Sequence, residues 1–205
     1  MKITFEYCSL HYLKQWLKDD KPIVQTMRQG TRQEKLKALN TFINFYQVAR
    51  NFPRACDIEL GKARYEPVLD IIDPLTADDF KDGDLATNIQ SVADQISAQY
   101  NGKGVLSATT KVLWTKVQAP VVIYDSRVRK ALGSPTGNLP KFLNKWQAQY
   151  QQHENQVHAA CLMLPKLATG EIAPNAATPD YIESIATQDW FKQRVFDIYL
   201  WHIGG

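Results

Sequence analysis

Cysteine is scarce in this sequence, and its three thiols, Cys8, Cys56 and Cys161, lie far apart with no CxxC pair. An odd and scattered set excludes a disulfide framework, a cysteine zinc site and a four-cysteine iron–sulfur cluster. Thiols of this kind are usually buried, in a protein of a reducing compartment. We therefore expect no metal, no cofactor and a cytoplasmic location.

Long apolar runs and a strong charge imbalance are also missing. No stretch approaches the roughly 20 apolar residues of a transmembrane helix, and residues 1–16 lack the core of a signal peptide. Lys and Arg number 24 and Asp and Glu 21, so the net charge is only +3. Such a mild excess permits a polyanionic partner without requiring one. We expect a monomer that has no membrane partner.

Strand-like alternation is not found either, and the apolar run at 121–124 is too short to seed a sheet. A chain of 205 residues buries roughly 70% of its unfolded surface without help from disulfides or metals. No internal repeat or low-complexity linker divides it. The prediction is an all-α, bilobal helical bundle that forms one domain over residues 1–205, with two interleaved lobes.

Helical periodicity and capping signals mark the expected helices. Ser9 is the predicted cap of a first helix, and Thr31 with Glu34 forms a capping box before a helix that Pro53 ends. The segment 65–75 fits either a short helix between prolines or an irregular packed stretch. Further helices are predicted at 85–100, from 106 to the break at 120, at 126–132, at 140–164, from 179 after a Thr-Pro cap, and from about 188 to the frayed glycines 204 and 205.

A glycine turn, Gly102-Lys103-Gly104, separates two of these helices, as in a helix–hairpin–helix motif. Glycine takes positive φ angles at little cost, and the turn leaves bare amide groups at the start of the next helix, near Leu106. Such amides suit a DNA phosphate, and Lys103 adds a positive charge there. The same glycines also fit a plain helix C-cap.

Asp125 stands at the end of an apolar approach. Pro120 ends the preceding helix, the segment 121–124 is aliphatic and aromatic, and Asp125 then opens a short helix. Aspartate accepts amide hydrogen bonds at a helix N-cap, and this role alone would explain its presence. Arg127 and Arg129 would keep the carboxylate ionised. A fixed, ionised carboxylate suits a reaction that passes through a cationic sugar.

The stretch from 101 to 132 resembles the helix–hairpin–helix DNA glycosylases, and in particular their 8-oxoguanine branch. The hairpin glycines of the family match Gly102 and Gly104, its small residue in the second hairpin helix matches Ala108, and its catalytic aspartate matches Asp125. The resemblance implies a double-stranded DNA partner with a damaged or modified base, and hydrolysis of the N-glycosidic bond after base flipping. Asp125 would stabilise the oxocarbenium-like sugar or orient the attacking water.

One departure from the family concerns the nucleophile. Bifunctional members carry a lysine two residues before the small helix residue, and that position is Leu106 here. The resemblance therefore implies a monofunctional enzyme, because no Schiff base can form at Leu106. Lys111 is the remaining candidate for lyase chemistry, and otherwise Lys111 and Lys116 are expected to face solvent. The loop before the aspartate is also aliphatic, whereas relatives are richer in glycine and proline there.

The residues predicted to contact DNA lie in the hairpin and near the carboxylate. They are Gly102, Lys103, Gly104, Val105, Leu106, Ser107, Lys111 and Arg127. Tyr124 and Trp114, close to the motif, are candidates for a base pocket. Trp16, Tyr46 and Trp201 are further candidates from flanking helices, although aromatic side chains on helical faces more often build the core.

Two other functions stay open. A helix–hairpin–helix module that binds DNA without chemistry would show salt-sensitive binding and make no abasic product. An all-α interaction protein with an incidental glycine turn would not bind DNA at moderate salt. If the protein is a glycosylase, the sequence does not define which base it excises. The alternatives are damaged bases, removed in DNA repair, and hypermodified bases of phage DNA, removed in antiviral defence.

Overall fold

The structure is a computed structural model that describes residues 3–52, 63–81, 83–102, 104–173 and 175–205. Within these ranges the chain is helical and contains no strand, which confirms the all-α prediction, and residues 121–124 belong to neither a helix nor a strand. Contacts divide the chain into two compact units. Unit 1 comprises Met1–Asp19 and Asp125–Gly205, and unit 2 comprises Asp20–Tyr124.

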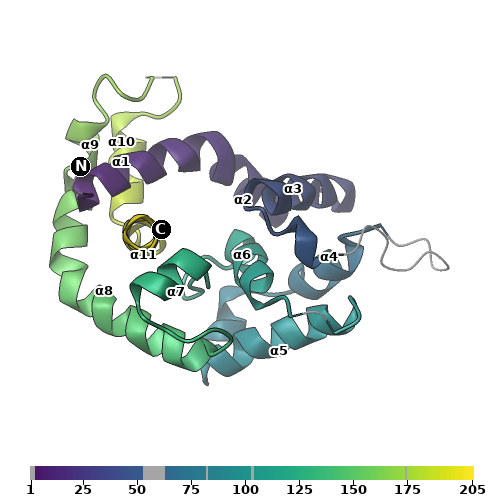
Figure 1. Cartoon of the computed structure of the whole chain (residues 1–205). Helices are drawn as coiled ribbons and strands as arrows, with labels where there is room; N and C mark the ends of the chain where they lie inside the picture. Colours follow the sequence, from purple (N-terminus) through teal and green to yellow (C-terminus); the bar gives the residue numbers. More distant parts are fainter. Residues whose placement is uncertain (1–2, 53–62, 82, 103, 174) are drawn as a thin grey trace. The chain divides into compact units, whose positions relative to one another are not determined.

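Unit 2 is built around α6 (Leu106–Lys116), which packs against α2, α3, α4 and α5. All eight residues from Ala108 to Thr115 are buried, so α6 is covered on every side and forms the core of the unit. The small side chains at its start allow this, since Ala108, Thr109 and Thr110 are 0% exposed. The surrounding elements are α2 (Lys21–Gln29), α3 (Arg32–Phe45), α4 (Glu66–Ile72) and α5 (Leu85–Ala98), with short 3-10 turns at Ala49–Asn51 and Ala77–Phe80 (Figure 1).

Capping chemistry in unit 2 follows the sequence closely. The capping box at Thr31 is confirmed, because its hydroxyl accepts from the Glu34 amide and the Glu34 carboxylate accepts from the Thr31 amide at 2.7 Å. The helix ends at Phe45, earlier than predicted, because Gln47 takes a positive φ of 54°. Pro53, the predicted stop, lies outside the described residues. The open alternative at 65–75 is settled by α4, a short helix with a proline in its first turn.

The prediction that Lys111 and Lys116 face solvent is wrong. Lys111 is 4% exposed, and its Nζ donates to Ser107 Oγ at 2.9 Å. Lys116 Nζ lies 3.0 Å from Asp73 Oδ1, and Asp73 also binds Lys35 Nζ at 2.8 Å. Both lysines are enclosed because helices distant in sequence surround α6. The pattern of apolar residues within α6 alone cannot predict which helices cover its other faces.

Unit 1 is built around α11 (Asp189–Ile203), which packs against α1, α7, α8 and α10 (Figure 1). Its elements are α1 (Phe5–Gln15), followed by the π-helical turn Trp16–Asp20, which leads into unit 2, and then α7 (Ser126–Ala131), α8 (Leu139–Leu162), α9 (Leu164–Leu167) and α10 (Pro179–Ala186). The predicted Thr178 cap of α10 is confirmed by a hydrogen bond from the Tyr181 amide. Cys8 and Cys161 are buried free thiols, while Cys56 lies outside the described residues.

Two predictions in unit 1 are wrong. The cap of α1 is Thr4, whose hydroxyl accepts from the Tyr7 amide, and Ser9 lies inside the helix with its hydroxyl on the Glu6 carbonyl. Gly204 does not fray but is buried, and a Cβ atom placed on it would meet the Arg127 carbonyl oxygen at 2.0 Å. The end of α11 therefore touches the backbone of α7, a contact that only glycine permits.

Candidate functional site

Asp125 caps α7, as the sequence predicts. Its backbone is extended, with φ −113° and ψ 149°, and its Oδ1 accepts from the Arg127 amide at 2.9 Å. The preceding residues 121–124 are buried, whereas Asp125 itself is half-buried. The carboxylate is thus held in one orientation without being sealed in the core.

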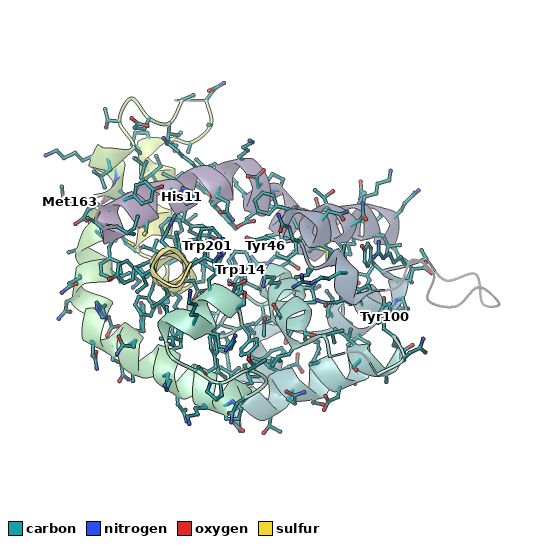
Figure 2. All side chains as sticks on the ribbon, viewed as in Figure 1. His11, Tyr46, Tyr100, Trp114, Met163 and Trp201 are labelled. Carbon is teal, nitrogen blue, oxygen red and sulfur yellow. The ribbon has the colours of Figure 1, made fainter. Side chains whose placement is uncertain are left out.

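Arg127 is held beside the same helix by the end of α11. Its guanidinium carbon lies 4.0 Å from the ring centroid of Trp201, a cation–π arrangement. The same guanidinium lies against Gly205, and the Arg127 carbonyl lies against Gly204. Trp201, labelled in Figure 2, is 38% exposed, so part of its side chain remains open to solvent.

A pocket of about 570 Å³ adjoins α7. Its walls come from α7, from the turn that follows it and from the last two residues: Ser126, Arg127, Arg129, Lys130, Gly133, Ser134, Gly204 and Gly205. Three of the lining side chains are cationic and none is a carboxylate or an aromatic ring. Asp125 is not among the lining residues, so the pocket begins immediately after the predicted catalytic residue.

A buried charged network lies behind this surface, and the sequence did not reveal it. Asp197 on α11 is 3% exposed, accepts from Trp146 Nε1 at 2.7 Å and pairs with Arg194 Nη1 at 3.1 Å. Burial, together with a smaller contribution from the charge of Asp125, raises the pKa of Asp197 to about 6, against the lowering effects of Arg194 and Trp146. Asp197 is therefore electrostatically coupled to the predicted catalytic carboxylate.

The only sequence signal for this network is weak. Arg194 and Asp197 are three residues apart, a spacing that places two side chains on one helical face. Such spacing usually indicates an ion pair exposed to solvent. Here both partners are buried: Arg194 is 5% exposed, and its guanidinium also lies over the Tyr12 ring.

The glycine turn connects α5 to α6, and the two helices pack against each other. The C-cap of α5 is Gln99. Gly102 follows it with φ +71°, and its amide donates to the Ser97 carbonyl at 3.0 Å, so this glycine helps to close the end of the helix, in line with the alternative to phosphate binding. A Cβ atom placed on Gly104 would meet only open space. Lys103 lies outside the described residues.

The start of α6 presents a mixed surface. Val105 occupies the N-cap position with no side-chain hydrogen bond to the first turn, and its side chain is buried. Leu106 and Ser107 are half-buried, and Ser107 accepts from Lys111. Lys111 therefore contacts the first turn of α6 from within the unit and not from its surface.

Two of the five candidates for a base pocket, Trp114 and Tyr124, belong to the core of unit 2. Trp114, labelled in Figure 2, is 1% exposed, and Tyr124 is 7% exposed. The amide of Tyr124 donates to Thr110 Oγ1 at 3.0 Å, which fastens the extended segment to α6. Their burial gives neither ring an open face on which a base could stack.

The predicted site residues thus fall into two groups. Asp125 and Arg127 are brought together at the start of α7 in unit 1, whereas the hairpin residues, Lys111, Trp114 and Tyr124 belong to unit 2. Among the described residues, no three His, Cys, Asp or Glu side chains gather closely enough to hold a metal ion. Nor is any helix in the described ranges both long and apolar enough to cross a membrane.

Comparisons with models of protein families, with curated proteins and with solved structures give no match to this chain.

Proposed function

We propose that the protein is a monofunctional DNA glycosylase in which Asp125 supplies the catalytic carboxylate. The observation that carries the proposal is the setting of this side chain, which is fixed by its N-cap hydrogen bond, half-buried, and followed by a cation-rich segment. Positive charge develops on deoxyribose as the base departs, and a preoriented carboxylate lowers the free energy of that state. The cations would meet the phosphates of the substrate strand.

DNA phosphate binding by the α5–α6 turn is the second part of the proposal. Val105 offers no side-chain cap to the first turn of α6, an eleven-residue helix, and Gly104 leaves the turn free of side-chain cover. Amides left uncapped at a helix start favour a phosphate. Lys111 is assigned a supporting role there, since it binds Ser107 of the first turn, and its burial offers no support for lyase chemistry.

A glycosylase without the charge on Asp125 should bind DNA and fail to excise. Asparagine is as good an N-cap as aspartate, so Asp125→Asn keeps the hydrogen bond to the Arg127 amide and removes only the charge. We expect the single-turnover excision rate to fall by roughly a hundredfold or more, with DNA affinity changed less than about threefold. The substrates are duplexes with oxidised, alkylated, mismatched or hypermodified bases, including modified phage DNA, and alkali reveals the abasic sites.

Asp84→Asn is the matched control for this experiment. Asp84 is the N-cap of α5 and accepts from the Ala86 amide at 3.1 Å, so the same substitution is made at a second helix start. It should leave excision unchanged. Excision by Asp125→Asn at the rate of the original protein would remove Asp125 from the mechanism, and strand breaks without alkali would restore the lyase hypothesis.

Non-catalytic DNA binding is the second candidate function. It is favoured by the helix-cap role of Asp125 and by the burial of the Trp114 and Tyr124 rings. It predicts salt-dependent binding to every duplex of the panel and no abasic product from any of them.

A further inference from the structure

The pocket beside α7 takes six of its eight lining residues from a segment without acidic residues, and the other two are Gly204 and Gly205. Between positions 126 and 153 the sequence has five Lys or Arg residues and no Asp or Glu. In the part of the chain that the structure describes, the pocket residues Arg127, Arg129 and Lys130 form no ion pair, and neither does Lys145 beside them. Like charges held close together repel one another, and this cost is relieved by an anionic ligand.

Two of these cations are held in place by the turn after α7. Arg129 Nη1 donates to the Ser134 carbonyl at 3.0 Å, and Lys145 Nζ donates to the carbonyls of Gly133 at 2.7 Å and Leu132 at 3.1 Å. The guanidinium of Arg129 has five N–H donors, so one such bond leaves others for a ligand. Lys130 is exposed and forms no hydrogen bond among the described residues, so its ammonium group is free to move onto a ligand.

The lining also indicates which part of a nucleic acid would fit. A volume of about 570 Å³ lies within the range of ligand sites. No aromatic side chain lines the pocket, so it offers no platform on which a base could stack. Glycines 133, 204 and 205 leave backbone uncovered in its walls, where a sugar–phosphate group can approach closely.

We infer that this pocket binds a backbone phosphate of the DNA strand, through Arg129 and Lys130 with Lys145 adding long-range attraction. The inference rests on the proposed function only in taking DNA as the partner, and it does not require excision. It adds to unit 1 a phosphate contact that is separate from the predicted hairpin contact of unit 2.

The test compares Lys130→Gln with Lys141→Gln. Both lysines are exposed, both belong to the acid-free segment, and each substitution removes one charge, but Lys141 does not line the pocket. Binding of each variant to an undamaged duplex is measured over a range of salt concentrations. Each phosphate contact contributes about 0.9 to the slope of log K against log salt. We expect Lys130→Gln to reduce this slope by about 0.9 and to weaken binding at low salt several-fold, with little change for Lys141→Gln.

A second arm tests the phosphate chemistry without DNA. Inorganic phosphate is titrated into the protein while the amide NMR signals of Gly133 and Ser134 are followed, with Lys130→Gln as the comparison. Saturable shifts that Lys130→Gln weakens support a phosphate site, including the case in which the protein binds no DNA and the proposed function fails. Absence of those shifts together with equal salt slopes for the two variants overturns the inference, whatever the excision assay shows.

Discussion

Removal of Asp197 should destabilise the protein more than any single surface change. Asp197 and Arg194 are 3% and 5% exposed, and their pair is reinforced by the 2.7 Å hydrogen bond from Trp146. Asp197→Ala leaves a guanidinium without its carboxylate inside the core. Breaking a buried pair in this way costs about 3 to 5 kcal/mol, and for a chain of this size each kcal/mol lowers Tm by roughly 2 to 4 °C. We therefore expect Tm to fall by about 10 °C.

The cause is separated from general damage by four further variants, one of which is Arg194→Met alone. Asp197→Asn keeps an acceptor for the Trp146 indole, so its free energy of unfolding should fall less than that of Asp197→Ala. Adding Arg194→Met to Asp197→Asn removes both charges, and a double-mutant cycle should return about 2 kcal/mol of favourable coupling. Asp189→Ala breaks a solvated pair with Lys192 on the same helix, where Asp189 is 81% exposed, and should cost about 0.5 kcal/mol.

Denaturant unfolding followed by circular dichroism gives these free energies. A loss below about 1 kcal/mol for Asp197→Ala, within the range of a surface pair, would show that the buried pair does not stabilise the fold. A double variant as unstable as the sum of its single variants would show that Arg194 and Asp197 do not interact.

Two more predictions concern buried residues of unit 1. Burial raises the pKa of Asp197 from 3.8 to about 6, so between these pH values the folded protein keeps a proton that the unfolded chain releases. The free energy of unfolding should therefore decrease, relative to that of Asp197→Asn, as pH rises from about 4 to 6. A difference between the two proteins that does not change with pH over that window would contradict this. Gly204→Ala should lower the free energy of unfolding by about 1 to 3 kcal/mol, because the added Cβ would lie 2.0 Å from the Arg127 carbonyl oxygen. The same substitution should slow excision, because it would move α7 and its N-cap, Asp125. The control Gly104→Ala has open space and a φ outside the left-handed region, and it should be nearly neutral in thermal unfolding. Equal losses of stability from the two glycine substitutions would refute the packing argument.

Several features were written in local sequence. The capping box at Thr31, the Thr178 cap and the N-cap at Asp125 each depend on residues within three positions of one another, so they could be predicted from the chain alone. The prediction that Ser9 caps the first helix used the same rule and was wrong, because the helix begins earlier, is capped by Thr4 and contains Ser9. The all-α class followed from the absence of alternation and from the recurrence of helical periods.

The contacts at the predicted site also divide into local ones and ones that join distant segments of the chain. Asp125 and Arg127 are two positions apart, and their hydrogen bond is a local feature of α7. The contact of Arg127 with Trp201, and the wall that glycines 204 and 205 give to the pocket, join segments more than 70 residues apart in the chain. No motif spans that distance, so the pocket could not be read from the sequence.

What the sequence determined by itself was the positions of caps, turns and helical faces, because these depend on hydrogen bonds and side-chain periods within a few residues. Tertiary structure alone decided that Lys111 is enclosed, that Asp197 carries its charge in the core, and that Gly204 must lack a side chain. Those outcomes depend on which distant helix covers each face, and burial, dielectric environment and close backbone approach exist only once the helices have packed.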